Sequence, residues 1–285
     1  MAPPVAYRSS RPVRRLLFGL ASLLTLLMIL WGSAQALDAL SIEEERIARS
    51  YSGVAEIDLR HAHGNVDLVR ADGRRVIVAI DSRHGFLSAH EREDELRGGE
   101  LRLRGSCDFL TLGTCEEDYR IEVPRGVAVS VRTSAGETIA RGLRDGDIEL
   151  RSSAGPVRAL DVRGSSVELR SNAGPVTAIG VRARRLTLES HAGGIDVSRS
   201  IARRVVASTS AGATDVELLR PPLSVDAHSS AGGVTVRVPD AAYDVNAHTS
   251  AGQEDVRVRQ RPASHRKIDA ESSAGDVSVL PLRLR

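Results

Sequence analysis

Residues 148–176 read IELRSSAGPVRALDVRGSSVELRSNAGPV, and this stretch decides the fold because it repeats itself at a spacing of 19 residues. The shared element is Ser/Thr-x-Ala-Gly, which recurs eight times in the chain. Its glycines follow one another at spacings of 19, 19, 19, 19, 20, 20 and 23 residues: Gly136, Gly155, Gly174, Gly193, Gly212, Gly232, Gly252 and Gly275. Such a period indicates a repeat architecture, in which short units bury their apolar faces by stacking on one another.

Apolar and hydroxyl residues stand at fixed offsets from each glycine. Seven positions before it all eight residues are Val, Ile or Leu, and three positions before it all are Ser or Thr. These odd offsets share one face of a strand, because strand side chains alternate between faces. After the glycine the apolar residues move to even offsets, as Ala159, Ala178 and Val197 do. The change of parity predicts a strand, a glycine corner and a second strand in each coil.

The repeat therefore predicts an all-β fold, namely a β-solenoid (a single-stranded β-helix) with coils of 19–20 residues over residues 122–285. We expect the inward Ser/Thr column to be hydrogen-bonded, since buried hydroxyls need partners. Residues 38–121 are expected to form a capping β segment with a cysteine loop, and Gly64 marks a divergent first coil. Residues 89–97 are charged and are predicted to form a loop or an exposed turn.

The N-terminus is a separate segment. Four arginines precede an uncharged run of 22 residues, from Leu16 to Leu37, and about 20 apolar residues span a bilayer as a helix. This predicts a basic cytoplasmic segment at 1–15 and a transmembrane helix at 16–37, with the remainder outside the cytoplasm. The alternative is a signal peptide that is cleaved near Ala36, because Ala34-Gln35-Ala36 fits a cleavage site. Both interpretations export the chain from residue 38 onward.

Charge and cysteine content narrow the function classes. The formal net charge is only +2, which argues against a nucleic-acid-binding protein. Cys107 and Cys115 both lie in the exported part, where an even number of cysteines favours a disulfide. Two free thiols are the alternative.

The motif Ser-Ala-Gly-x-Val stands at residues 153–157, 230–234 and 273–277. Together with the basic N-terminus, the single apolar segment and the stretch Asp118–Pro124, it resembles a bacterial family of adhesin-like domains of unknown function. The resemblance covers roughly residues 50–285. It implies a single-stranded β-helix displayed outside the cytoplasmic membrane, and it implies little about activity.

Three arginines, Arg132, Arg151 and Arg170, stand four positions before successive glycines and point outward. Stacked in this way they could bind an acidic glycan or a lipid headgroup. Glu149 and Glu168 lie on the same outward face and are expected to neutralise much of this stripe.

Two further outward columns carry titratable groups. His228 and His248 are expected on adjacent coils, about 5 Å apart, where they could hold a metal, but the sequence offers no further ligands. Asp196, Asp215 and Asp255 share a column that could serve acid/base chemistry on a polysaccharide. No base stands nearby, so we predict no catalytic residue, no metal site and no cofactor.

These patterns predict a non-catalytic, extracytoplasmic β-solenoid of the bacterial envelope, acting as an adhesin or surface-binding module. Its expected partners are the membrane, through residues 16–37, and a glycan, a cell-wall polymer or a surface protein, but not nucleic acid. The alternative is a structural or regulatory envelope-stress protein that acts through a membrane partner. A polysaccharide-acting β-helix enzyme is the least favoured reading.

Overall fold

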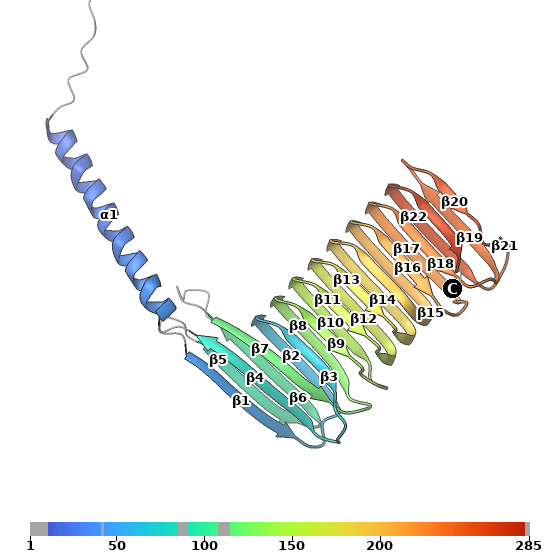
Figure 1. Ribbon diagram of the computed structural model, residues 1–285, viewed down its shortest axis with the longest axis horizontal. Coiled ribbons are helices and arrows are strands. Elements are labelled where there is room, and N and C mark those ends of the chain that lie inside the picture. The colour runs from blue at the N-terminus through green and yellow to red at the C-terminus, as the bar shows by residue number, and fades with distance from the viewer. Residues whose placement is uncertain (1–10, 41–42, 85–89, 108–114, 283–285) are drawn as a thin grey trace, which may run out of the picture.

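The computed structural model describes residues 11–40, 43–84, 90–107 and 115–282, and it consists of one helix followed by a long stack of β-coils (Figure 1). The helix is α1 (Arg11–Leu40). In the stack each coil contributes one strand to each of two ladders. Within a ladder, neighbouring strands from successive coils are parallel and in register.

The first ladder holds the strands that lead into the glycine corners. Its parallel strands are, in spatial order, β6 (Glu100–Cys107), β2 (Glu56–His63), β8 (Ala128–Ala135), β10 (Ile148–Ala154), β12 (Arg163–Ala173), β14 (Arg182–Ala192), the second half of β15 (Ile195–Ala211), β17 (Ser224–Ala231), β22 (Lys267–Ala274) and β19 (Ala242–Thr249). Beyond β6, the antiparallel strand β5 (His90–Arg97) covers the edge.

The second ladder holds the strands that follow the corners. Its parallel strands are β7 (Cys115–Val123), β3 (Val66–Arg70), β9 (Thr138–Arg141), β11 (Val157–Leu160), β13 (Val176–Ile179), the first half of β15, β16 (Thr214–Leu218), β18 (Val234–Val238), β23 (Val277–Pro281) and β20 (Glu254–Val256). Antiparallel strands β4 (Val76–His84) and β1 (Glu43–Tyr51) extend it beyond β7, and the short β21 (Arg259–Gln260) pairs with β19.

The spatial order of the coils departs from the chain order at both ends. Ala270 in β22 pairs with Ala227 in β17 on one side and with Ala247 in β19 on the other. The last coil of the sequence is therefore inserted between the two coils that precede it. At the opposite end, β6 and β7 lie outside β2 and β3, although they follow them in the chain. The coils therefore do not stack in chain order at these places, because each end of the stack is closed by a segment that doubles back.

The core lies between the two ladders, and its residues come from the predicted columns. Leu150, Leu169 and Leu188, five positions before their glycines, are fully buried, as are Val157 and Val176, two positions after theirs. Burial alternates along each strand and changes parity at the corner. The predicted all-β, solenoid-like fold is thus confirmed.

The buried hydroxyl column is bonded to the backbone of the neighbouring coil. Ser171, Ser190 and Thr209 each donate from the side-chain oxygen to the carbonyl of the preceding corner glycine, at 2.8, 3.0 and 2.8 Å. This confirms that the column is hydrogen-bonded. Ser152 is an exception, since its buried hydroxyl has no partner among the described residues.

Residues 90–97 form strand β5, so the prediction of a loop or turn there was wrong. The stretch shows no clear apolar alternation because the strand lies at the end of the stack. Its charged side chains pair instead with other strands, Arg92 with Glu117 at 2.7 Å and Asp94 with Arg49.

The N-terminal apolar run is helical, but in the described part of the chain no helix is both long and apolar enough to cross a membrane. The structure therefore does not support the predicted transmembrane span at residues 16–37. Strand β6 ends at Cys107 and β7 begins at Cys115. The two cysteine side chains lie outside the described residues, so their disulfide stays a prediction.

The corner glycines allow the coils to approach closely. A Cβ atom on Gly136 would lie 2.0 Å from the carbonyl oxygen of Gly64, and one on Gly155 would lie 2.1 Å from that of Gly136. Both residues also adopt a positive φ, of 101° and 147°, which L side chains rarely adopt. Each corner is thus built on the backbone of the corner below it.

Replacing Gly136 by Ala tests this packing. We expect Gly136→Ala to lower the free energy of unfolding by about 2 kcal/mol or more, from backbone strain and steric overlap. Gly73→Ala is the matched control, because no atom lies within 4 Å of the added Cβ and its φ is ordinary; we expect a change within about 0.5 kcal/mol. Urea denaturation measures both, and equal midpoints for the two variants would contradict the packing.

Candidate functional site

The predicted arginine stripe forms a continuous column on the outward face of the first ladder. Arg151 pairs in register with Arg132 on β8 and with Arg170 on β12. The column extends further than the repeats indicated, because Arg60 and Arg104 continue it through β2 and β6. We call these five residues the arginine ladder.

A second column of carboxylates is interleaved with the arginine ladder. Arg132 lies 3.0 Å from Glu149, Arg151 lies 2.7 Å from Glu149 and 2.9 Å from Glu168, and Arg170 lies 2.6 Å from Glu168. At one end of the column Asp58 forms ion pairs with Arg104 and Arg132, and at the other end Glu189 forms an ion pair with Arg170. An anionic ligand would have to displace these carboxylates, so the stripe is largely compensated within the chain, as expected.

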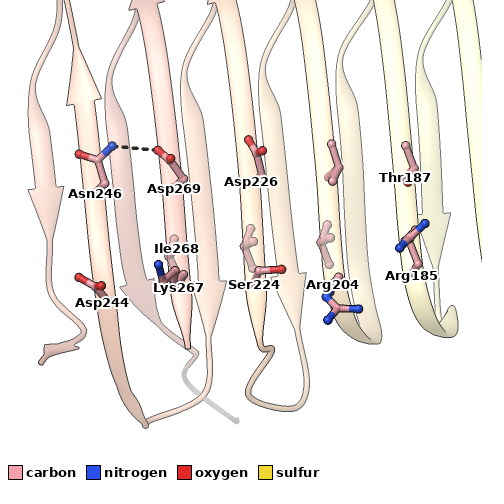
Figure 2. A pocket seen from close by; sticks show the side chains of 13 residues that line it. Arg185, Thr187, Arg204, Ser224, Asp226, Asp244, Asn246, Lys267, Ile268 and Asp269 are labelled. Atoms are coloured by element: carbon pink, nitrogen blue, oxygen red, sulfur yellow. Dashed lines mark hydrogen bonds between the residues drawn. The ribbon is translucent and has the colours of Figure 1, made fainter. Parts of the chain in front are cut away.

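A groove crosses the outward face of the first ladder near the C-terminal end of the stack (Figure 2). It has a volume of about 690 Å³. Two neighbouring columns line it. One consists of Arg185, Arg204, Ser224, Lys267 and Asp244, and the other includes Asp226, Asp269 and Asn246. Figure 2 shows Asp269 between Asp226 and Asn246, whose amide donates to Asp269 at 3.0 Å. The column of Asp226, Asp269 and Asn246 follows from one shared offset, but sequence reasoning did not place Asp269 beside Asp226, because this contact requires β22 to stand between β17 and β19.

The aspartate column offers little for acid/base catalysis. Asp196 and Asp215 are neighbours in register, and Asp215 forms an ion pair of 2.5 Å with Arg237. Burial raises the pKa of Asp215, which Arg237 opposes and the charge of Asp196 reinforces. Asp255 lies apart from them, since both Thr235 and Ser278 stand between. The column therefore presents an ion-paired carboxylate beside an exposed one.

The two outward histidines are not neighbours, so the expectation of a stacked pair was wrong. Glu271 on β22 pairs in register with His228 on one side and with His248 on the other. The inserted coil is the physical reason for the separation. Among the described residues, no group of three or more His, Cys, Asp or Glu side chains is placed to hold a metal ion.

A buried polar cluster at the N-terminal end was missed by sequence reasoning. His61 is only 4 % exposed, and neither ring nitrogen has a hydrogen-bond partner among the described residues. Glu117 is equally buried; it pairs with Arg92 at 2.7 Å and accepts a hydrogen bond of 3.2 Å from the hydroxyl of Tyr119. The signal was present, since His61 stands three positions before Gly64, where the repeats carry Ser or Thr. The cluster is closed to solvent and has the character of a structural element.

Residues 109–280 match the family model Toastrack DUF4097. The chain belongs to this family. The match covers the repeats and leaves out helix α1 and the first coil. A comparison with curated proteins gives no match.

Several solved structures resemble the chain at low identity. One, named a "putative adhesin" from Bacteroides fragilis, is 16% identical with a TM-score of 0.42 and covers 84% of this chain and 97% of its own. Two come from Parabacteroides distasonis, each covering 85% of this chain and 97% of its own. One is a "putative adhesin" at 11% identity and a TM-score of 0.48, and the other a "putative lipid binding protein" at 13% and 0.41. These likenesses are too distant to carry an argument about function.

The buried histidine makes stability depend on pH. Burial lowers the pKa of His61 and outweighs the opposing charge of Glu117. The unfolded chain, with an ordinary His pKa of about 6.5, then binds a proton that the folded chain does not, so stability is present above this pH and falls as the pH drops below it. Thermal unfolding between pH 5 and 8 should show this slope in the wild type and a smaller slope in His61→Gln. His63→Gln, an exposed control on the same strand, should behave like the wild type; a His61→Gln slope equal to that of the wild type would contradict the assignment.

Proposed function

We propose that this Toastrack chain is a non-catalytic binding module of the bacterial envelope that works outside the cytoplasm as an adhesin or surface-binding protein. The observation that carries the proposal is the set of outward columns, which the solenoid holds in register over many coils. Columns of like residues on a rigid backbone present a repeating surface, which suits a polymer or a patterned surface better than a single small molecule.

The groove in Figure 2 supports the binding role. Five neighbouring strands contribute to it, and it brings basic, acidic and amide side chains together, so it offers partners to both charged and neutral hydrogen-bonding groups. A catalytic role has weaker support. Acid/base work on a sugar needs two carboxylates in a shared cleft, one of them protonated, whereas Asp215 is held by Arg237.

The N-terminal segment supports export. Apolar side chains of α1 such as Leu23, Ile29 and Trp31 are more than half exposed. A basic segment followed by an apolar run and a small-residue cleavage site is the pattern of an export signal. We propose that this segment directs the chain to the membrane, where it is either retained or cleaved near Ala36, and that the β-coils lie outside.

The test uses the purified full chain together with spheroplasts that produce it and whose inner membrane is intact. Both are offered a panel of labelled ligands: cell-wall polymer, neutral and acidic glycans, and matrix proteins. We expect saturable binding of at least one ligand class to the purified chain. The same binding should be found on the spheroplasts when the chain is retained, or in the fluid released when they are made when the chain is cleaved. Spheroplasts that lack the gene are the control.

Two outcomes would count against the proposal in different ways. Purified chain that binds no ligand on the panel would contradict the binding role. Binding by the purified chain, but neither by the spheroplasts nor by the fluid released when they are made, would contradict the location outside the cytoplasm.

A further inference from the structure

A second stack of arginines stands where three successive coils turn from the second ladder back to the first. Arg144, Arg163 and Arg182 each follow a buried residue of this turn and occupy matching positions. Backbone hydrogen bonds fix their spacing: the Arg163 amide donates to Leu143 at 2.9 Å, and the Arg182 amide donates to Val162 at 2.8 Å. We call these three residues the arginine corner, and adjacent strands place them about 4.8 Å apart along the stack.

The arginine corner differs from the arginine ladder in how its charges are compensated. Within the described residues, none of its three guanidinium groups forms an ion pair, whereas Arg132, Arg151 and Arg170 each contact two acidic side chains. The nearby Asp145 is taken by Arg125.

The positive charges at the arginine corner also repel one another. The pKa of Arg144 is lowered, first by partial burial and then by the positive charges of Arg163, Arg70 and Arg182. Like charges directly opposite one another on adjacent strands destabilise a sheet. The fold therefore holds together charges that repel, in a place where an anion would relieve the repulsion.

Basic side chains continue from the corner onto the first ladder. Arg184, Arg185, Arg203 and Arg204 are exposed, and none of them has an ion pair in the described part of the chain. Arg184 donates to the Ser165 hydroxyl at 2.8 Å. Since the whole chain has a net charge of only +2, this surface is a local concentration of positive charge.

Two shallow hollows lie within this basic surface. One, of about 460 Å³, is lined by Arg70, Arg125, Arg144 and Arg163 together with the acidic Asp72 and Asp145. The other, of about 310 Å³, is lined by Ser165, Ser166, Arg184, Arg185, Arg204 and Asp147. Guanidinium groups bind phosphate and carboxylate through paired hydrogen bonds, and the hydroxyls of the second hollow can add to such contacts.

We propose that the arginine corner and the adjoining arginines bind an extended polyanion of the cell envelope, with phosphate or carboxylate groups repeated along its length. This inference rests on the proposed binding role outside the cytoplasm and gives that role a ligand class and a location. A polymer fits better than a flat membrane, because the corner arginines form a single line parallel to the stack and meet the anionic groups in succession.

The test compares two variants that lose the same charge. Arg144→Gln, Arg163→Gln and Arg182→Gln together remove the corner, while Arg132→Gln, Arg151→Gln and Arg170→Gln together remove three members of the compensated ladder. The full chain, purified in a neutral detergent, is titrated with fluorescent inorganic polyphosphate and with polygalacturonate, which separate phosphate from carboxylate chemistry. Circular dichroism checks that each variant is folded, and the single charge reversal Arg163→Glu serves if the triple corner variant is not.

We expect at least one polyanion to bind the wild type saturably and more weakly as salt rises. The corner variant should raise the Kd on the order of tenfold, since three exposed ion pairs are lost, and the ladder variant should change it far less. Three results would overturn the inference. An equal loss in both variants would indicate general charge attraction. Corner-dependent binding only to mixed micelles that contain phosphatidylglycerol would indicate a membrane surface. If the chain binds neutral wall polymer but neither polyanion, the proposed binding role is retained and the polyanion is ruled out as its ligand.

Discussion

The close approach of successive coils at the glycine corner is the constraint on which the rest of the structure depends. Parallel strands are held at a fixed spacing by backbone hydrogen bonds, and at the corner this spacing leaves no room for a Cβ atom between one coil and the next. Glycine at every corner keeps the coils in register, and inward Ser or Thr hydroxyls tie most corners to the coil below. Because the coils are in register, outward residues at the same offset from successive glycines lie side by side and form a column on the surface.

Two columns of arginine show how the same geometry gives surfaces with different properties. In the arginine ladder, Glu149 and Glu168 stand two positions away on the same face and bridge neighbouring guanidinium groups. At the arginine corner, the nearby Asp145 is paired with Arg125, and none of the three guanidinium groups forms an ion pair within the described residues. The first column contributes modestly to holding coils together, as exposed ion pairs do. The second is available to a ligand, and the difference lies only in what occupies the neighbouring columns.

Columns could be predicted from the sequence, but the order of the coils could not. The burial of Leu150 and Val157 and the neutralisation of Arg151 follow from offsets within a repeat, and strand alternation alone is enough to place them. The coil that ends at Gly275 carries the same motif as those at Gly232 and Gly252, so nothing local indicates that β22 lies between β17 and β19. The contact of Asp226 with Asp269 in the groove of Figure 2 and the separation of His228 from His248 both depend on that insertion. Strand β5 was missed for a related reason, because its polar side chains find partners only in the assembled end of the stack.

The order of the coils can be measured directly by disulfide trapping in a background with Cys107→Ser and Cys115→Ser. Asp226 and Asp269 are neighbours in register, whereas Asn246 lies one strand further away. The chain with Asp226→Cys and Asp269→Cys should therefore oxidise to an intramolecular disulfide. The chain with Asp226→Cys and Asn246→Cys should not, because two strand spacings, about 9.6 Å, exceed the reach of a disulfide. The reverse result, with only the second pair bridged, would mean that the coils stack in chain order, and the inserted coil would have to be abandoned.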